Sequence, residues 1–354
     1  MAAPVDILHV SPGTTAGWRR ADAELRRALE ELGMSVATCT SEYRWARHLR
    51  RTVLMTDLAE AAAMRRALGK ALRVHAPRAI VYSSPQAAML QPRRRLGGAT
   101  AARFDVPAAL NRSGPGSGAL HRLERRALAE VRMLLPIGVA PREDARRALA
   151  LDTPSIALPI PVEVRPQAGA ARDRIAVSYA GNPEKKGLDL LVGAWARVTP
   201  ARWRLVVTGI EPERARRFLE RRALREPPGI EWAGFLDEGA YAALVSRARV
   251  FLAASRYEDY GIAQLEALAA GTPLVTVPSD GPYEALRLAR ELAPGLVAAR
   301  VSDDALAGAL EAGFALGDAE RAAYASRAAE LLHPYSRAEL RRRLRDDVLP
   351  VLLR

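Results

Sequence analysis

Short apolar runs alternate along this chain with longer segments whose apolar residues recur at helical spacing. The short runs are typical of buried β-strands, and the longer segments are typical of amphipathic helices. The pattern predicts strands at 5–10, 35–39, 79–83, 132–137, 175–180, 204–208, 230–233, 250–254, 274–277 and 296–301. It predicts helices at 19–32, 56–75, 142–150 and 335–354, with further helices between the strands of the second half.

Strict alternation of buried strands and helices indicates parallel sheets that are joined by right-handed crossovers. The scheme occurs twice, so we expect an α/β chain with two Rossmann-like, doubly wound domains that face a cleft. The length of 354 residues also exceeds what one compact core usually accommodates. The Pro-rich segment Leu158–Pro166 separates the predicted domains, which we place at 1–160 and 167–334, with a C-terminal helix over 335–354.

Composition narrows the functional classes. No uninterrupted apolar stretch is long enough to predict a transmembrane helix, and the N-terminal sequence lacks the basic region of a signal peptide. The lone Cys39 excludes an intramolecular disulfide. The five histidines are scattered without the spacing of a helical zinc site. We therefore expect a cytoplasmic protein without a bound metal.

The net charge of +13 is concentrated in the first half of the chain. Residues 1–160 contain 25 Lys and Arg against 14 Asp and Glu, whereas residues 161–354 contain 28 against 26. The first half therefore faces something anionic or is a solvated basic surface. We find no nucleic-acid-binding module. Arg outnumbers Lys fifty to three, so the adjacent Lys185 and Lys186 stand out.

The most informative segment is 255–271, with the sequence SRYEDYGIAQLEALAAG. It follows a predicted buried strand and enters a predicted helix near Gly261. A strand that turns into a helix through such a loop presents free backbone N–H groups and a positive helix end, which suits a diphosphate. Glu266 on the helix could accept from ribose hydroxyls, and Glu258 on the loop from a second hydroxylated group. Two solvated surface carboxylates are the simpler alternative.

The segment resembles the E-x7-E region of retaining GT-B glycosyltransferases of the family-four type. Both carboxylates, the Gly before the helix and the Gly271–Pro273 turn after it match that pattern, while Asp259 stands where a Gly is usual. Residues 179–191 resemble the family's G-R-x-x-x-x-K-G element, with Lys186 and Gly187 in place but Asn182 where an Arg is usual. The resemblance covers 175–335 well and 1–160 loosely.

The resemblance implies that the second domain binds a nucleotide-diphosphate sugar and that the first domain binds the acceptor. It implies catalytic roles for Glu258 and Lys186, and a polar role in the first domain for Asp105, at the strand end Arg103–Pro107. Residues expected to contact the donor are Gly13, Asn182, Lys185, Lys186, Gly209, Gly234, Phe235, Glu258, Gly261, Ile262, Ala263 and Glu266. Lys185 is the candidate to replace the missing Arg.

The family uses no bound metal and no protein nucleophile, so the resemblance implies no cofactor beyond the co-substrate, for which UDP or GDP is favoured. The implied acceptor is a hydroxyl of a lipid-linked, glycan or small molecule. Relatives that act on lipid-linked acceptors often dock on membranes through basic surfaces, so the clusters Arg44–Arg51 and Pro92–Arg95 suggest an anionic surface, the inner face of the plasma membrane. The resemblance also implies that the C-terminal helix crosses back to the first domain.

Two other functions stay open. The same fold could support a sugar-nucleotide epimerase or hydrolase, which product analysis with the donor alone would distinguish. The chain could instead be a non-catalytic basic binding protein on a degenerate GT-B scaffold. Two departures from the family pattern favour this second alternative. They are Asn182, and the strand end at Phe104 without the His that relatives carry there.

Overall fold

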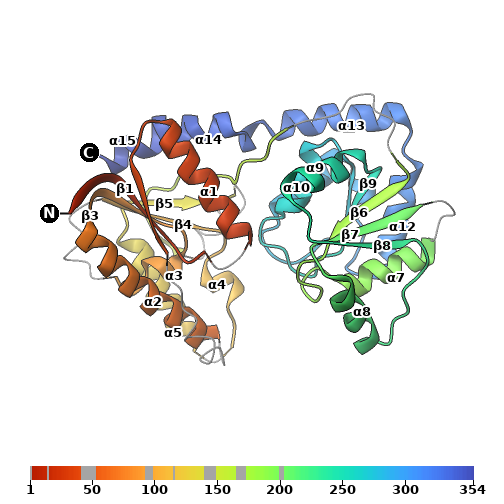
Figure 1. Cartoon of the computed structure of the whole chain (residues 1–354), viewed down its shortest axis with the longest axis horizontal. Helices are drawn as coiled ribbons and strands as arrows, with labels where there is room; N and C mark the ends of the chain where they lie inside the picture. Colours follow the sequence, from red (N-terminus) through yellow and green to blue (C-terminus); the bar gives the residue numbers. More distant parts are fainter. Residues whose placement is uncertain are drawn as a thin grey trace. The chain divides into compact units, whose positions relative to one another are not determined.

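The structure, a computed structural model, describes residues 2–13, 16–40, 53–91, 99–114, 116–138, 149–164, 173–198 and 203–354. The chain divides into two compact units. The first contains Met1–Pro161 and the C-terminal segment Arg337–Arg354, and the second is Val162–Ser336 (Figure 1). The division falls inside the Pro-rich segment, and the chain end packs with the first unit.

The first unit is built on a five-stranded parallel sheet in the order β2-β1-β3-β4-β5. Its strands are β1 (Ala3–Ser11), β2 (Val36–Thr40), β3 (His75–Tyr82), β4 (Ala99–Phe104) and β5 (Met133–Pro136). Its helices are α1 (Ala16–Glu31), α2 (Val53–Val74), α3 (Pro85–Ala88), α4 (Ala108–Asn111), α5 (Ser117–Ala129), α14 (Arg337–Arg343), the π-helical turn η5 (Leu344–Val348) and α15 (Leu349–Leu352).

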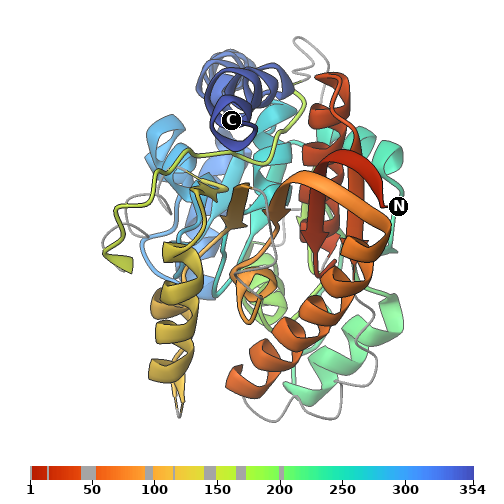
Figure 2. The same cartoon turned by 90° about the vertical axis from the view of Figure 1, so that its left-hand side faces the viewer.

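Helices cover both faces of this sheet, because successive strand residues point to opposite sides. Ile7 packs with Leu29 of α1 and Leu340 of α14 in one buried cluster. Its neighbour Leu8 packs with Met64 of α2 in another cluster, which also includes Leu128 of α5. Figures 1 and 2 show α2 and α5 on one side of the sheet, opposite α1 and the C-terminal helices.

The second unit repeats the architecture with the strand order β10-β9-β6-β7-β8, again parallel throughout. Its strands are β6 (Ile175–Tyr179), β7 (Arg204–Thr208), β8 (Ile230–Gly234), β9 (Val250–Ala253) and β10 (Leu274–Thr276). Its helices are α7 (Leu188–Val198), α8 (Pro212–Arg221), α9 (Glu238–Arg247), α10 (Ile262–Ala269), α11 (Glu284–Leu292), α12 (Asp303–Ala315), α13 (Asp318–Leu331) and the 3-10 turns η3 (Pro294–Leu296) and η4 (His333–Tyr335).

The predicted α/β class with two doubly wound parallel sheets is confirmed, but two strand predictions were wrong. The range 296–301 forms no strand, because the chain enters it through a 3-10 turn and only Val297 bridges to Thr276. The apolar pattern missed the strand β4, although the resemblance implied a strand end at Arg103–Pro107. The sequence of β4, ATAARF, has small residues and an Arg in place of a β-branched run. The predicted helix at 142–150 and the basic clusters at 44–51 and 92–95 lie wholly or mainly outside the described residues.

Each sheet has one point where the direction of strand addition reverses. In the first unit it lies between β1 and β3, and in the second between β6 and β9. Open α/β sheets bind ligands beyond the carboxyl ends of the strands at such switch points. In the second unit the loops at this position are 180–187 and 254–261. They contain five of the residues predicted from the sequence, Asn182, Lys185, Lys186, Glu258 and Gly261.

Candidate functional site

The two loops at the β6/β9 switch point touch backbone to backbone. Gly187 has a φ of +61°, and a Cβ there would overlap the Ala254 carbonyl oxygen. Nearby, the Arg256 N–H donates to the Lys185 carbonyl oxygen at 2.9 Å. The Arg256 guanidinium also holds both carboxylate oxygens of Asp189 at 2.7 Å. Glycine is therefore required at position 187 by both its backbone conformation and the close approach.

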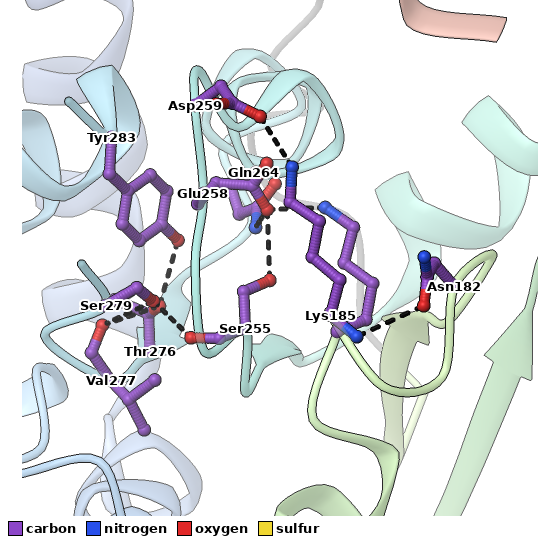
Figure 3. A network of polar contacts seen from close by, with 11 residues as sticks. Asn182, Lys185, Ser255, Glu258, Asp259, Gln264, Thr276, Val277, Ser279 and Tyr283 are labelled. Atoms are coloured by element: carbon purple, nitrogen blue, oxygen red, sulfur yellow. Dashed lines mark hydrogen bonds and ion pairs between the residues drawn. The ribbon is translucent and has the colours of Figure 1, made fainter. Parts of the chain in front are cut away.

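The Glu258 carboxylate is the centre of a buried polar network (Figure 3). The residue is only 6% exposed, and its Oε2 pairs with the Lys186 ammonium. The same oxygen accepts from Ser255 Oγ at 3.0 Å and from Gln264 Nε2 at 3.2 Å. Burial by itself would raise the pKa of Glu258. The charge and hydrogen bond of Lys186, the charge of Lys185 and the hydrogen bond of Ser255 outweigh burial, so the pKa is lowered. The carboxyl is thus held ionised.

Asn182 and Asp259, which depart from the family pattern, both contact Lys185, next to the ion pair of Lys186 with Glu258. Lys185 Nζ is 2.5 Å from Asp259 Oδ2, with both side chains partly exposed. Asn182 Oδ1 accepts from the Lys185 N–H at 3.1 Å, which closes the turn that carries the lysines (Figure 3). From the sequence, Asp259 was noted only as a departure from the family's usual Gly, and this ion pair was not predicted.

Helix α10 begins directly after the loop that carries Glu258 and Asp259. Gly261, its N-cap, has a φ of +85° and supplies no side-chain cap. A Cβ on Gly261 would lie 2.7 Å from Tyr283 Cε2, so the turn also requires glycine. The Ile262 and Ala263 N–H groups belong to the first turn, at the positive end of the helix dipole. The arrangement suits an anion at this end of the helix.

Tyr179, the last residue of β6, was not predicted as a site residue. A Cβ on Gly181 would lie 2.5 Å from the Tyr179 hydroxyl, and a Cβ on Gly209 would overlap its ring. The Lys186 ammonium lies 6.0 Å from the centre of the same ring. Burial raises the pKa of Tyr179, and the charges of Glu266 and Glu258 raise it further. Glu266, half-buried on α10, therefore lies near Tyr179. The sequence signal that could have identified Tyr179 as a site residue is its position at the end of a strand, shortly before Gly181.

The other predicted donor contacts of the second unit lie at the ends of neighbouring strands. The Gly209 N–H donates to the Gly234 carbonyl oxygen at 2.7 Å, which joins the ends of β7 and β8. Phe235 follows with 65% of its surface exposed. Gly209 thus connects with Tyr179, while Gly234 and Phe235 lie one strand further from Glu258.

Gly13 and Asp105, the two predicted site residues of the first unit, follow β1 and β4. Gly13 has a φ of +59° with open space where a Cβ would lie, and its N–H donates to Ser11 Oγ at 3.1 Å. Asp105 Oδ1 accepts from the N–H of Val106 at 2.7 Å. Both therefore shape loops at the carboxyl edge of the first sheet.

A buried network at the β1/β3 switch point was missed from the sequence. His9 Nε2 is 2.5 Å from Ser83 Oγ, which donates to Asp22 Oδ1 at 2.6 Å. Ser11 Oγ also donates to Asp22, and the Arg103 guanidinium lies 3.7 Å from it. Burial would raise the pKa of Asp22, but hydrogen bonding and charge from His9 and the charge of Arg103 lower it. The residues of this network come from β1, α1, β4 and the position after β3, so no local sequence pattern predicts that they meet.

Neither a metal-binding group nor a membrane-spanning helix is present among the described residues. No group of three or more His, Cys, Asp or Glu side chains there is arranged to hold a metal ion. No described helix has the length and apolar character needed to cross a membrane.

Comparison with known proteins identifies the family of the second unit. Residues 163–331, nearly all of that unit, match the model of the family described as Glycosyl transferases group 1. The chain is also 48% identical over 73 residues to a GDP-mannose-dependent alpha-(1-6)-phosphatidylinositol dimannoside mannosyltransferase of Mycobacterium tuberculosis. That match covers 20% of this chain and 18% of the relative. The resemblance inferred from the E-x7-E region is thereby confirmed.

Solved structures support the fold over the full chain length. A glycosyltransferase from Rickettsia africae aligns with a TM-score of 0.70 and 12% identity, over 99% of both chains. A sucrose-phosphate synthase from Thermosynechococcus elongatus aligns with a TM-score of 0.70 and 16% identity, over 97% of both chains. The chain therefore has the fold of GT-B glycosyltransferases.

Proposed function

We propose that this protein is a retaining glycosyltransferase that moves a sugar from a nucleotide-diphosphate sugar to an acceptor hydroxyl. One observation carries the proposal most directly. Lys186, Glu258 and the uncapped N-terminus of α10 meet at the β6/β9 switch point, so a cation, a buried carboxylate and free N–H groups converge. The family match over 163–331 covers all three.

In this proposal, the donor diphosphate binds between Lys186 and the first turn of α10 at Ile262 and Ala263. Glu266 accepts from the ribose hydroxyls, and Glu258 accepts from hydroxyls of the transferred sugar. Glu258 suits that role because its lowered pKa keeps it an acceptor at neutral pH. In the proposal, the Lys185 ammonium leaves Asp259 and pairs with a phosphate oxygen of the donor. Lys185 would thereby take the role of the Arg that the family usually has at the position of Asn182.

The proposed chemistry breaks the bond between the anomeric carbon and the leaving phosphate oxygen and forms a bond to the acceptor oxygen on the same face. The acceptor oxygen attacks the anomeric carbon directly, so no protein nucleophile is needed, and the acceptor proton passes to the leaving diphosphate. Negative charge grows on the diphosphate as the first bond breaks. The ammonium of Lys186 and the helix N-terminus are fixed before the reaction, so they stabilise this charge without reorganisation. Asp105 is proposed to take a polar role near the reacting sugar, and Gly13 is proposed to contact the donor.

A thermal-shift panel tests the donor site. UDP, GDP, ADP, dTDP and their sugar conjugates are added to wild type, Glu266→Gln and Lys186→Ala. A ligand at 100 times its dissociation constant adds about 2.7 kcal/mol to the free energy of unfolding. We expect one nucleoside diphosphate to stabilise wild type and both substitutions to abolish most of the shift. GDP is an informative arm, because the mycobacterial relative is named for GDP-mannose.

Lys70→Ala is the matched control, because Lys70 is the remaining lysine of the chain and lies exposed on α2 of the first unit. It should leave the shift unchanged. Lys186→Ala leaves Glu258 buried without its ion-pair partner and so lowers stability by itself. Glu266→Gln tests the nucleotide site without this loss of stability. The absence of a shift with every nucleotide would refute the donor site. Products formed from the donor alone would instead indicate an epimerase or hydrolase.

We also propose that the first unit docks on an anionic membrane, which would place the protein on the inner face of the plasma membrane. Support comes from helices α2 and α5, which cover one face of the first sheet. They expose seven basic side chains, Arg65, Arg66, Lys70, Arg73, Arg122, Arg125 and Arg126. Co-sedimentation with anionic vesicles should exceed that with neutral vesicles and fall with salt. Binding that ignores both variables would refute docking through charge.

A further inference from the structure

The chain passes between its two units after Pro161 and again after Ser336. These two crossings, at 161–162 and 336–337, are called the passages below. Within the second unit, the residues next to the two passages are joined by a hydrogen bond. The Val162 N–H donates to the Tyr335 carbonyl oxygen at 2.9 Å, and both residues are almost fully buried. A displacement of either passage is therefore shared by the other.

The Tyr335 side chain continues this connection into the interior of the second unit. Its hydroxyl donates to Glu284 Oε1 and accepts from Arg287 Nη2 at 3.0 Å. Arg287 also lies 3.3 Å from the Glu284 carboxylate. Glu284 is the first residue of α11 and is 0% exposed. A buried carboxylate is costly unless it is paired and hydrogen-bonded, so this group ties the start of α11 to the passages.

The start of α11 is in turn bonded to the loop of the candidate donor site. The Glu258 N–H donates to the Asp280 carbonyl oxygen at 3.0 Å, and the Glu258 carbonyl oxygen accepts from the Tyr283 N–H at 3.2 Å. The Ala285 N–H donates to the Tyr260 carbonyl oxygen at 3.3 Å. The Tyr283 ring also packs against the Gly261 turn. The loop 258–261 and the segment 280–285 are therefore held as one body.

We infer that Glu284 and Tyr335 are positioning residues that couple occupancy of the Glu258 loop to the two passages between the units. The inference rests on the proposed function, because the nucleotide-sugar donor is the ligand that would occupy this loop. A donor that competes for Lys186 changes the bonding of Glu258, and Glu258 is fixed to the segment that begins α11. Glu284 and Tyr335 then carry the change to Val162. Coupling requires that donor binding favours one arrangement of this element over another.

Hydrogen exchange with the nucleotide panel UDP, GDP, ADP and dTDP tests the coupling in wild type, Tyr335→Phe and Tyr324→Phe. Tyr324 is the matched control, because it is a buried tyrosine of the same unit whose hydroxyl accepts from the Leu274 N–H at 3.1 Å. We expect the nucleotide that binds to slow exchange in peptides that cover 258–264 in all three proteins. In peptides that cover 158–164 and 332–337, it should slow exchange in wild type and Tyr324→Phe but not in Tyr335→Phe.

Steady-state kinetics give a readout that a merely structural role would not move. Tyr335→Phe should lower kcat about tenfold while the donor KM stays within about twofold, because donor contacts are untouched. The double variant Tyr335→Phe/Glu284→Leu replaces both partners by apolar groups and so avoids an unsatisfied buried carboxylate if the single variant is unstable. It should behave as Tyr335→Phe does.

The outcomes separate this inference from the proposed function. Protection of the passages in Tyr335→Phe equal to that in Tyr324→Phe would overturn the coupling. Nucleotide-dependent protection confined to 258–264 in wild type would also overturn the coupling and leave the donor site intact. No protection anywhere with any nucleotide would overturn the proposed function and this inference with it.

Discussion

The two units have the same kind of sheet but use their switch points differently. At β6/β9, the second unit presents a lysine, a carboxylate and a free helix end, and Lys186 and Lys185 keep some exposure. At β1/β3, the first unit buries its polar groups, since His9, Ser11 and Ser83 are each at most 2% exposed. The β6/β9 switch point thus has ion pairs whose lysines are partly exposed, whereas the β1/β3 switch point has a buried network that fixes its own loops. A shared fold therefore does not imply shared chemistry.

The largest effect is expected from Asp22→Asn in the first unit. Asp22 accepts from Ser11 and Ser83 and lies near Arg103. Removal of one partner from a buried charged network costs about 3 to 5 kcal/mol. Urea denaturation should show this loss, and hydrogen exchange should localise it to peptides of the first unit. The nucleotide-induced protection of 258–264 should remain.

Asp6→Asn is the control for that substitution. Asp6 of β1 is partly exposed and pairs with Arg78 of β3, so we expect a cost of about 1 kcal/mol or less. Equal losses in the two variants would contradict the view that the first switch point is a closed structural network.

A pair of glycine substitutions sharpens the comparison at the next level. Gly13 and Gly187 have almost the same φ, +59° and +61°, but only Gly187 has a backbone atom in the way of a Cβ. Gly13→Ala should cost about 1 kcal/mol from the left-handed conformation alone. Gly187→Ala should cost about 3 kcal/mol, because strain and overpacking add, and it should also abolish nucleotide binding. Thermal melting with and without nucleotide measures both, and similar costs would show that the two loops do not differ in packing.

Two buried carboxyls provide a contrast that depends on pH. Glu124 of α5 accepts from the Ala108 N–H at 2.7 Å, but burial, with the nearby charge of Asp57, raises its pKa from 4.5 to about 7. Glu258 has a lowered pKa because lysines surround it. Between pH 4.5 and 7 the folded chain keeps the Glu124 proton that the unfolded chain loses, so stability falls as pH rises through this window.

Glu124→Gln removes an ionisation that opposes folding. We expect it to add up to about 3 kcal/mol to the free energy of unfolding above pH 7, since the pKa rises from 4.5 to about 7 and one pKa unit corresponds to about 1.4 kcal/mol. It should add little below pH 4.5. Denaturation curves at several pH values measure the difference. A gain that is the same at pH 4 and pH 8 would rule out the ionisation of Glu124 as its cause.

The sequence by itself determined the local parts of this protein. Alternating buried strands and helices predicted two parallel sheets, and the Gly261 turn with Glu258 and Glu266 predicted the helix α10. These features depend on neighbouring residues, so periodicity and turn chemistry reveal them. The same rules failed at 296–301, where only Val297 bridges to a neighbouring strand. They also failed at β4, whose small residues become a strand through pairing with β3 and β5.

Only the tertiary structure decided which of these parts meet. The ion pair of Lys185 with Asp259 joins residues 74 positions apart, and Ser83 reaches Asp22 across 61 positions. Such contacts depend on strand order, which places β6 beside β9 and β1 beside β3. Strand order results from the packing of both faces of a sheet and leaves no local signal. The residues of the site could therefore be predicted singly, whereas their ion pairs and the connection to the passages through Tyr335 required the fold.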